Sequence, residues 1–346
     1  MSMLVNVKDL SLKDLEALIA GLGKEQYRAR QIMRWLYGRG ASSFAEMTDL
    51  AKELRAELGR MARISSLSPL AEERAPDGTR KYLFGLGDGN QVESVLIPDD
   101  GRLTLCISTQ AGCAMGCRFC LTGRGGLARD LTAGEILDQI LGVVRGLAKD
   151  ERISNCVLMG MGEPLANYDR VKQALGIMAA DLGFGLSRRR ITLSTVGLIP
   201  QIKRLFAEQV PCRLAVSLNA TTQKVRSFLM PISRRYPLGD LLTACRDLPL
   251  SPRERITFEY VLIQGVNDSA EDAARLVRLI KGIRSKVNLI PLNECPGILF
   301  RRPPDKTVLR FQKVLVEGGY TTIIRESRGG AISAACGQLR GRIKGS

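Results

Sequence analysis

Histidine is absent from all 346 residues of the sequence. Its absence removes imidazole as a metal ligand and as a general base, so any chemistry must depend on cysteine, carboxylate and cofactor. Long hydrophobic runs are also missing: nowhere do about 18 consecutive apolar residues occur, and the N-terminus lacks the apolar core and cleavage site of a signal peptide. We therefore expect a cytoplasmic protein with no membrane partner.

The composition is that of a basic, cysteine-containing globular protein. Hydrophobic residues make up 45% of the chain, which is enough for a large core. Nine cysteines, an odd number, fit a reducing compartment with metal or redox chemistry better than a disulfide scaffold. The formal charge of +16 favours a polyanionic partner, and nucleic acid is the first candidate. A basic surface with no binding role is the alternative.

The N-terminal part of the chain has the spacing of a small helical module. Three amphipathic patterns lie between residues 11 and 60, with Ser11 and Thr48 placed as N-caps. Residues 24–39 mix arginine with aromatic side chains, a composition that suits either RNA contact or a solvated face around a packed tryptophan. Alternating apolar and polar residues on both sides of the turn at 87–90 predict a β-hairpin that bridges two domains.

From residue 103 onward, six β-rich runs alternate with six helix-like segments. This alternation predicts an α/β fold with a parallel sheet closed into a partial (βα)6 barrel, whose ligands gather at the C-terminal ends of its strands. Thr132 and Glu135 form a capping box at the start of the first barrel helix. The predicted units are an N-terminal helical RNA-binding domain (1–75), a β-hairpin extension (76–98), the barrel (99–330) and a C-terminal loop and tail (331–346).

A loop after the first barrel strand carries Cys113, Cys117 and Cys120 in a CxxxCxxC spacing. Cysteine thiolates are the usual ligands of iron–sulfur clusters. Three thiolates on a four-iron cluster leave one iron open to a bound molecule, which implies chemistry rather than simple electron transfer. Zinc is the main alternative metal, but a structural zinc site normally needs a fourth Cys or His nearby, and the sequence has no histidine.

This three-cysteine loop resembles that of the radical S-adenosylmethionine superfamily, in which the open iron of a [4Fe-4S] cluster chelates the methionyl group of S-adenosylmethionine. Flanking motifs narrow the resemblance to the RlmN and Cfr family of RNA methyltransferases, over residues 76 to 340. The motifs, in the family's order, are TLCISTQAGCAMGCRFCLTGRGGLARDLTAGEI, MGMGEP, STVG, SLNA, NLIPLN and RGGAISAACGQL.

The resemblance implies a set of cofactor contacts at the strand ends. Asn219 stands where the family usually has histidine, and Glu294 stands where proline is common, so the contact at Asn219 departs most from the pattern. An asparagine amide can imitate one edge of an imidazole. The implied S-adenosylmethionine contacts are Gly162, Glu163, Ser194, Ser217, Leu218, Asn219 and Asn293.

The resemblance also implies catalytic roles. Cys336 is the methyl-carrying cysteine, Cys106 is the resolving thiol that forms a transient disulfide with Cys336, and Glu93 is the proton acceptor. Two molecules of S-adenosylmethionine are used per turnover: one methylates Cys336, and the other yields a radical that abstracts hydrogen from that methyl group. An external electron donor of flavodoxin or ferredoxin type serves the cluster, and the protein is expected to be a monomer.

The implied substrate is an adenine of 23S rRNA, and also of tRNA. Methylation at carbon 2 is expected, while methylation at carbon 8, as in Cfr, remains open. Two competing hypotheses are a radical enzyme that acts on a peptide or metabolite and a non-catalytic iron–sulfur RNA-binding redox sensor. Candidate phosphate contacts are Arg188–Arg190, Arg234, Arg235, Arg253, Arg255, Arg301, Arg302, Arg340, Arg342 and Lys344.

Overall fold

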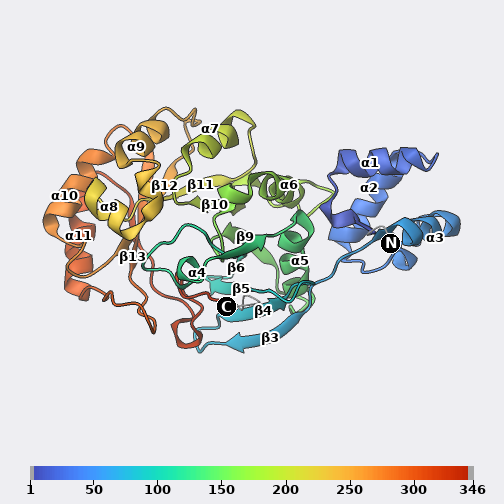
Figure 1. Ribbon diagram of the computed structural model, residues 1–346, viewed down its shortest axis with the longest axis horizontal. Helices are drawn as coiled ribbons and strands as arrows, with labels where there is room; N and C mark the ends of the chain where they lie inside the picture. The colour runs from blue at the N-terminus through green and yellow to red at the C-terminus, as the bar shows by residue number, and fades with distance from the viewer. Residues whose placement is uncertain (1–3, 342–346) are drawn as a thin grey trace.

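The computed structural model describes residues 4–341 and has a ten-stranded sheet at its centre (Figure 1). Within this sheet, all neighbouring strands from β6 to β14 pair in parallel, which confirms the predicted α/β fold with a partial barrel. The short final strand was not predicted from the sequence. The parallel strands are β6 (Arg102–Cys106), β9 (Ile153–Leu158), β10 (Ile191–Thr195), β11 (Arg213–Ser217), β12 (Ile256–Leu262), β13 (Ser285–Pro291) and β14 (Thr322–Ile324).

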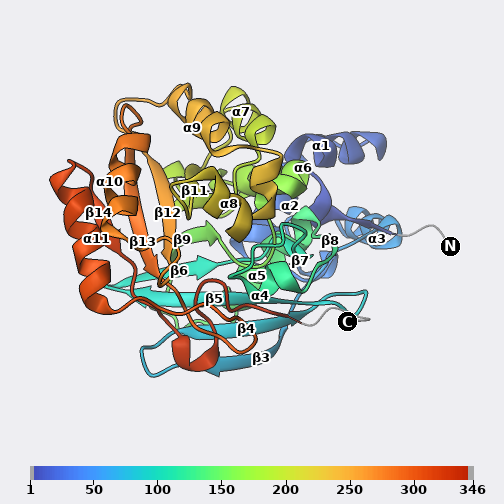
Figure 2. The same ribbon diagram turned by 60° about the vertical axis from the view of Figure 1, so that its left-hand side comes forward.

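Helices follow the parallel strands in sequence, and Figure 2 shows α7, α9, α10 and α11 along the outer side of the sheet. The predicted capping box at the start of α5 is present: the backbone N–H of Glu135 donates to Thr132 Oγ1, and the backbone N–H of Thr132 donates to the Glu135 carboxylate. The barrel helices are α5 (Ala133–Val144), α6 (Tyr168–Ala179), α7 (Ile199–Ala207), α8 (Gln223–Leu229), α9 (Leu238–Arg246), α10 (Ala270–Leu279) and α11 (Asp305–Glu317).

An antiparallel extension continues the sheet beyond β6. Strands β4 (Arg80–Gly85) and β5 (Gln91–Asp99) pair as the predicted hairpin, and β5 continues onto β6. Strand β3 (Pro69–Arg74) forms the outer edge and is exposed along its whole length. The extension therefore brings hairpin side chains beside the first barrel strand.

The N-terminal module contains α1 (Leu12–Gly21), α2 (Tyr27–Met33) and α3 (Lys52–Met61), with a small parallel pair of β1 (Val5–Asn6) and β2 (Ala62–Arg63). Ser11 caps α1 through a capping box with Asp14, as predicted for that residue. The prediction for Thr48 is wrong, because α3 begins later and its N-cap is Ala51, which makes no side-chain cap.

A buried ion pair joins the N-terminal module to the barrel. The Lys8 ammonium donates to the carboxylate of Asp138 on α5, and both side chains are fully buried. Burial lowers the pKa of Lys8 and raises the pKa of Asp138, while Ser65 Oγ donates a further 2.6 Å hydrogen bond to Asp138. Asp9 accepts from the backbone N–H of Gly134 in the first turn of α5 at 2.7 Å. No helix within residues 4–341 is long and apolar enough to cross a bilayer.

Candidate active site

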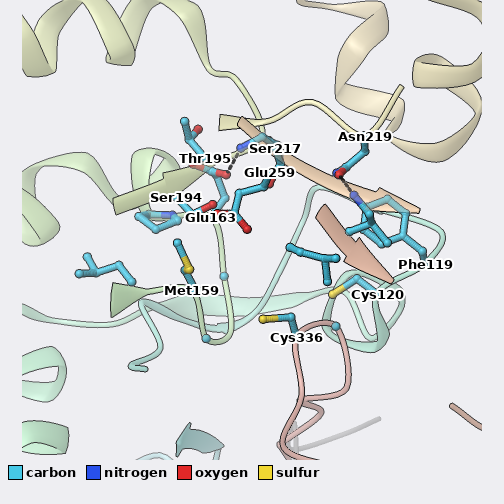
Figure 3. Close-up of a pocket in the computed structure, with 18 of the residues that line it drawn as sticks. Phe119, Cys120, Met159, Glu163, Ser194, Thr195, Ser217, Asn219, Glu259 and Cys336 are labelled. Carbon is cyan, nitrogen blue, oxygen red and sulfur yellow. Dashed lines mark hydrogen bonds between the residues drawn. The ribbon is translucent and has the colours of Figure 1, made fainter. Parts of the chain in front are cut away.

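A cavity of about 160 Å³ opens at the C-terminal ends of the parallel strands (Figure 3). Parallel barrels place their ligands at this end. Eight of the predicted site residues line it, although they are spread over more than 200 positions of the sequence. These eight residues are Cys120, Gly162, Glu163, Ser194, Ser217, Asn219, Asn293 and Cys336.

Gly162 and Glu163 follow β9 and turn the chain at the cavity wall. Gly162 has a φ of 102°, and a Cβ atom there would lie 2.6 Å from Cβ of Gln110, so only glycine fits. The Glu163 carboxylate is almost fully buried and accepts hydrogen bonds from the backbone N–H groups of Leu165 (3.0 Å) and Val196 (2.8 Å). Burial raises its pKa to about 7. Glu163 thus ties two loops together and contributes a carboxylate to the cavity wall.

Ser194 and Ser217 end neighbouring strands and present their side chains at the cavity. Leu218 does not line the cavity: its side chain is fully buried in the core, and its N–H donates to the carbonyl oxygen of Glu259 at 2.9 Å. Asn219 has a left-handed backbone with φ of 56°, a conformation that asparagine tolerates better than most residues. Its side-chain oxygen accepts from the N–H of Val261, while its Nδ2 contacts Met230 Sδ, a weak acceptor, so Nδ2 remains available to a ligand.

The three-cysteine loop runs from β7 (Gln110–Gly112) to the short helix α4 (Leu121–Arg124). The N–H of Cys113 donates to Gly126 O at 2.6 Å, and the N–H of Cys120 donates to Cys117 O at 3.2 Å, which makes the loop compact. Cys113 and Cys117 are buried, whereas Cys120 is half-buried and lines the cavity.

The donor chemistry of this loop fits an iron–sulfur cluster. The three thiols are close enough to influence one another's ionisation, and burial raises the pKa of Cys113 to about 12. Within residues 4–341 no three His, Cys, Asp or Glu side chains are already arranged as a metal centre. Metal binding removes the thiol protons and draws such ligands together. The fit therefore rests on three cysteines in one loop, with Cys120 open to the cavity.

The C-terminal loop brings Cys336 to the opposite side of the cavity from Glu163, next to Cys120 (Figure 3). Several hydrogen bonds hold the loop there, and three of them lie within two residues of Cys336. Leu121 N–H donates to Gly337 O at 2.8 Å, Asn293 Nδ2 donates to Cys336 O at 3.0 Å, and Gln338 Nε2 donates to Glu294 O at 3.0 Å. Cys336 is exposed as a residue, but burial of its thiol raises the pKa to about 11.

Cys106 lies at the end of β6, behind the cavity wall. It is buried and does not line the cavity, but it is near enough to Cys336 for that thiol to help raise the pKa of Cys106. All nine cysteines are free in the structure. Burial raises the pKa of Cys106, so its thiol is protonated in this state.

Glu93 on β5 also lies outside the cavity lining. Its carboxylate accepts hydrogen bonds from the backbone N–H groups of Arg340 (2.7 Å) and Gly341 (3.1 Å) and lies 3.6 Å from the Lys81 ammonium. The C-terminal segment that follows Cys336 therefore covers Glu93 in this structure.

Two buried charged residues near the cavity were missed by the sequence analysis. Glu259 extends from β12 into the cavity, where Asn288 Nδ2 donates to it at 2.8 Å, and burial raises its pKa (Figure 3). A carboxylate within the apolar run ITFEYVLI was the signal that could have revealed it. Arg226 lies on α8, a helix that the sequence pattern did not predict, and it is fully buried.

The basic clusters differ in their surroundings. Arg188 pairs with Glu254, and Arg301 pairs with Glu294, so part of their charge is balanced within the protein. Arg234 and Arg235 are exposed near the end of the 3₁₀ segment Pro231–Arg234, beside the cysteine loop. Arg342 and Lys344 lie outside the described residues.

A parallel partial barrel with a three-cysteine loop after its first strand, and a cavity where that loop meets the strand ends, defines a radical S-adenosylmethionine enzyme. A sequence model of the radical SAM superfamily matches residues 107–277, and a model of the ribosomal RNA large subunit methyltransferase N-terminal domain matches residues 5–64.

Known proteins resemble the chain over nearly its whole length. The dual-specificity RNA methyltransferase RlmN of Geobacter sulfurreducens is 57% identical over 99% of this chain and 94% of its own. The protein of the same name from Syntrophobacter fumaroxidans is 52% identical over 97% of this chain and 98% of its own. The crystal structure of a radical SAM methyltransferase from Sphaerobacter thermophilus superposes with a TM-score of 0.91 at 45% identity, covering 97% of this chain and 99% of that one.

The chain belongs to the RlmN family of RNA methyltransferases, which confirms the resemblance found in its motifs. Membership implies S-adenosylmethionine and an iron–sulfur cluster as cofactors.

Proposed function

We propose that the protein methylates carbon 2 of an adenine in 23S rRNA and in tRNA, and that the methyl group passes from S-adenosylmethionine through Cys336. One observation carries the proposal: Cys336 lines the same cavity as Cys120 of the cysteine loop and the carboxylate of Glu163. The cavity therefore brings together the proposed methyl acceptor, a proposed cluster ligand and a wall suited to the cofactor.

Cys113, Cys117 and Cys120 would hold a [4Fe-4S] cluster through their thiolates. When bound, the cluster supplies the electron that cleaves S-adenosylmethionine, a reaction that protein side chains cannot perform. The chain's own contribution is to place Cys120 on the cavity wall, so that the open side of the site faces the bound molecule.

The cavity wall suits a cationic cofactor. S-adenosylmethionine carries a sulfonium and an ammonium, and the wall offers two buried carboxylates, Glu163 and Glu259. Opposite charges attract more strongly in a poorly solvated site than in water. Glu163 would accept from the ammonium, while the hydroxyls of Ser194 and Ser217 and the Nδ2 of Asn219 offer polar contacts to the remaining groups. Gly162 lets the backbone approach, and Leu218 fixes the end of its strand.

Cys336 would act first as a nucleophile. After loss of its proton, the sulfur attacks the methyl carbon of the first S-adenosylmethionine, so that the new S–C bond forms as the sulfonium–methyl bond breaks and S-adenosylhomocysteine leaves. Asn293 holds the carbonyl oxygen of Cys336 and so fixes the direction of its side chain. The second S-adenosylmethionine serves the later transfer of this carbon to the adenine.

Release of the product would use Glu93 and Cys106. The RNA adduct would return its unpaired electron to the cofactor site as Glu93 takes the proton from the modified ring carbon. The Cys106 thiolate would then attack the Cys336 sulfur, so that the S–S bond forms as the bond between the Cys336 sulfur and the methylene carbon breaks. That carbon would take up a proton from solvent and leave as the methyl group of the released base, with a disulfide left behind. Two electrons from an external donor of flavodoxin or ferredoxin type then restore both thiols. Because backbone N–H groups of Arg340 and Gly341 occupy the Glu93 carboxylate, this step requires the C-terminal segment to move.

The test is an anaerobic reaction of the reconstituted protein with 23S rRNA or tRNA, S-adenosylmethionine and dithionite, followed by mass spectrometry of the nucleosides. The proposal expects 2-methyladenosine together with 5'-deoxyadenosine. Formation of 8-methyladenosine instead would assign the Cfr-type activity. Absence of both methylated nucleoside and 5'-deoxyadenosine would favour a non-catalytic redox sensor.

A further inference from the structure

Arg226 is a fully buried arginine in the middle of α8. Its guanidinium donates to three main-chain carbonyl oxygens: Nε to Leu218 at 3.2 Å, and Nη2 to Val196 at 2.7 Å and to Ser217 at 3.2 Å. These carbonyls belong to the segments that end β10 and β11. Arg226 therefore holds together two strand ends that form part of the cavity wall.

The charge of Arg226 is not balanced by any carboxylate among residues 4–341. Its Nη1 atom is buried without a hydrogen-bond partner in the same range, and no ion pair involves this residue. Burial lowers its pKa to about 10, so it remains cationic at neutral pH. A buried charge without a counter-charge is costly, and proteins normally pair it or use it.

The ionisable groups next to Arg226 are the thiols of Cys117 and Cys245. Burial raises the pKa of Cys245 to about 12, so that thiol is neutral and supplies no negative charge. Cys117 is different, because it becomes a thiolate if it binds iron. Cys117 packs with Leu229 and Met230 at the end of α8, and the N–H of Arg118 donates to Leu229 O at 2.9 Å, so the cysteine loop is fixed directly against this helix.

We propose that Arg226 is the buried counter-charge of the cluster held by Cys113, Cys117 and Cys120, and that it raises the cluster's reduction potential. The inference rests on the proposed function, since it requires a cluster at these cysteines. Reduction adds one negative charge to the cluster, and a nearby buried cation stabilises the reduced form more than the oxidised form. Arg226 is a positioning residue through its three carbonyl contacts and an electrostatic partner through its charge.

The experiment is a redox titration of the anaerobically reconstituted full-length protein, monitored by electron paramagnetic resonance without S-adenosylmethionine. Arg226→Met removes the charge, Arg226→Lys keeps it, and Arg226→Gln removes it but keeps an amide donor for the carbonyls. We expect Met and Gln to lower the equilibrium constant for reduction at least about tenfold, equivalent to about 59 mV for a one-electron couple, while Lys stays close to the unmodified protein.

Arg118→Met is the matched control. Arg118 lies between two of the cluster cysteines but is exposed, with its guanidinium 4.4 Å from the centre of the Phe228 ring. Solvent screens such a charge, so its removal should leave the potential nearly unchanged. If Arg226→Met does not retain iron, the reduction potential of Arg226→Gln is compared with that of Arg226→Lys instead.

A lowered potential in the neutral variants with a normal value for Arg226→Lys supports the inference. Equal shifts of the reduction potential in Arg226→Lys and in the neutral variants would overturn the inference, because hydrogen bonding rather than charge would then set the potential. An unchanged potential in all variants would also overturn it. If the unmodified protein binds no iron after reconstitution, the proposed function itself fails, which distinguishes the two failures.

Discussion

The side-chain amide of Asn293 donates a 3.0 Å hydrogen bond to the main-chain carbonyl oxygen of Cys336. Ser327 in turn donates a short hydrogen bond to the side-chain oxygen of Asn293, so the amide orientation is fixed from both sides. Asn293 follows the barrel strand β13, whereas Cys336 belongs to the C-terminal loop. The rigid sheet thereby sets the position of the thiol that we propose as the methyl carrier.

Replacing Asn293 with alanine should slow methylation of Cys336. The loop would lose the anchor on Cys336 itself, and a small misplacement of a nucleophile can reduce a rate by about two orders of magnitude. We expect at least a tenfold lower rate in single-turnover experiments that follow the methylated Cys336 peptide, with the iron content unchanged.

Gln338→Ala is the comparison, because it removes a neighbouring anchor of the same loop without touching Cys336. A normal Cys336 methylation rate in Asn293→Ala, together with weaker S-adenosylmethionine binding, would show that Asn293 serves the cofactor alone.

Replacing Glu259 with glutamine should weaken S-adenosylmethionine binding. The amide can still accept from Asn288 Nδ2, so the substitution removes mainly the negative charge that a bound cationic cofactor would stabilise on Glu259 against its raised pKa. Equilibrium dialysis of the reconstituted protein should give a dissociation constant raised about tenfold, equivalent to about 1.4 kcal/mol. The surface variant Glu254→Gln should bind normally, and equal affinities in Glu259→Gln and the unmodified protein would exclude the proposed charge complementarity.

Replacing Lys8 with alanine should destabilise the protein strongly. The change leaves the buried carboxylate of Asp138 without its cation, which typically costs about 3–5 kcal/mol. The double variant Lys8→Met with Asp138→Leu should recover much of this loss, because it leaves neither charge unpaired. Urea unfolding followed by circular dichroism measures both effects. A double variant less stable than Lys8→Ala would contradict this account of the pair.

The sequence predicted what depends on short-range spacing. The CxxxCxxC loop, the alternation of strands with helices, and the capping boxes at Ser11 and Thr132 are each visible within a few residues. The convergence of Glu163, Ser194 and Ser217 also followed, because parallel strands place their ends at one edge.

What the sequence did not predict depends on contacts between distant segments. The backbone N–H of Arg340 donates to Glu93, although the two residues are 247 positions apart in the sequence. The sequence around either residue therefore does not reveal the contact. Arg226 lies on the seven-residue helix α8, too short for a clear periodic pattern, and its burial arises from strand ends that precede it. Thr48 has a side chain suited to an N-cap, but the helix begins at Lys52 after the N-cap Ala51, and a single capping residue type does not determine where a helix starts.

The central claim is that the methyl group reaches RNA through Cys336. A single-turnover time course with isotopically labelled S-adenosylmethionine tests it most directly, with mass spectrometry of both the Cys336 peptide and the RNA nucleosides at each time. The account predicts that label appears on Cys336 first and declines as methyladenosine forms, and that Cys336→Ala retains the cluster and S-adenosylmethionine binding but methylates no RNA. Labelled methyladenosine formed at a normal rate by Cys336→Ala would contradict it.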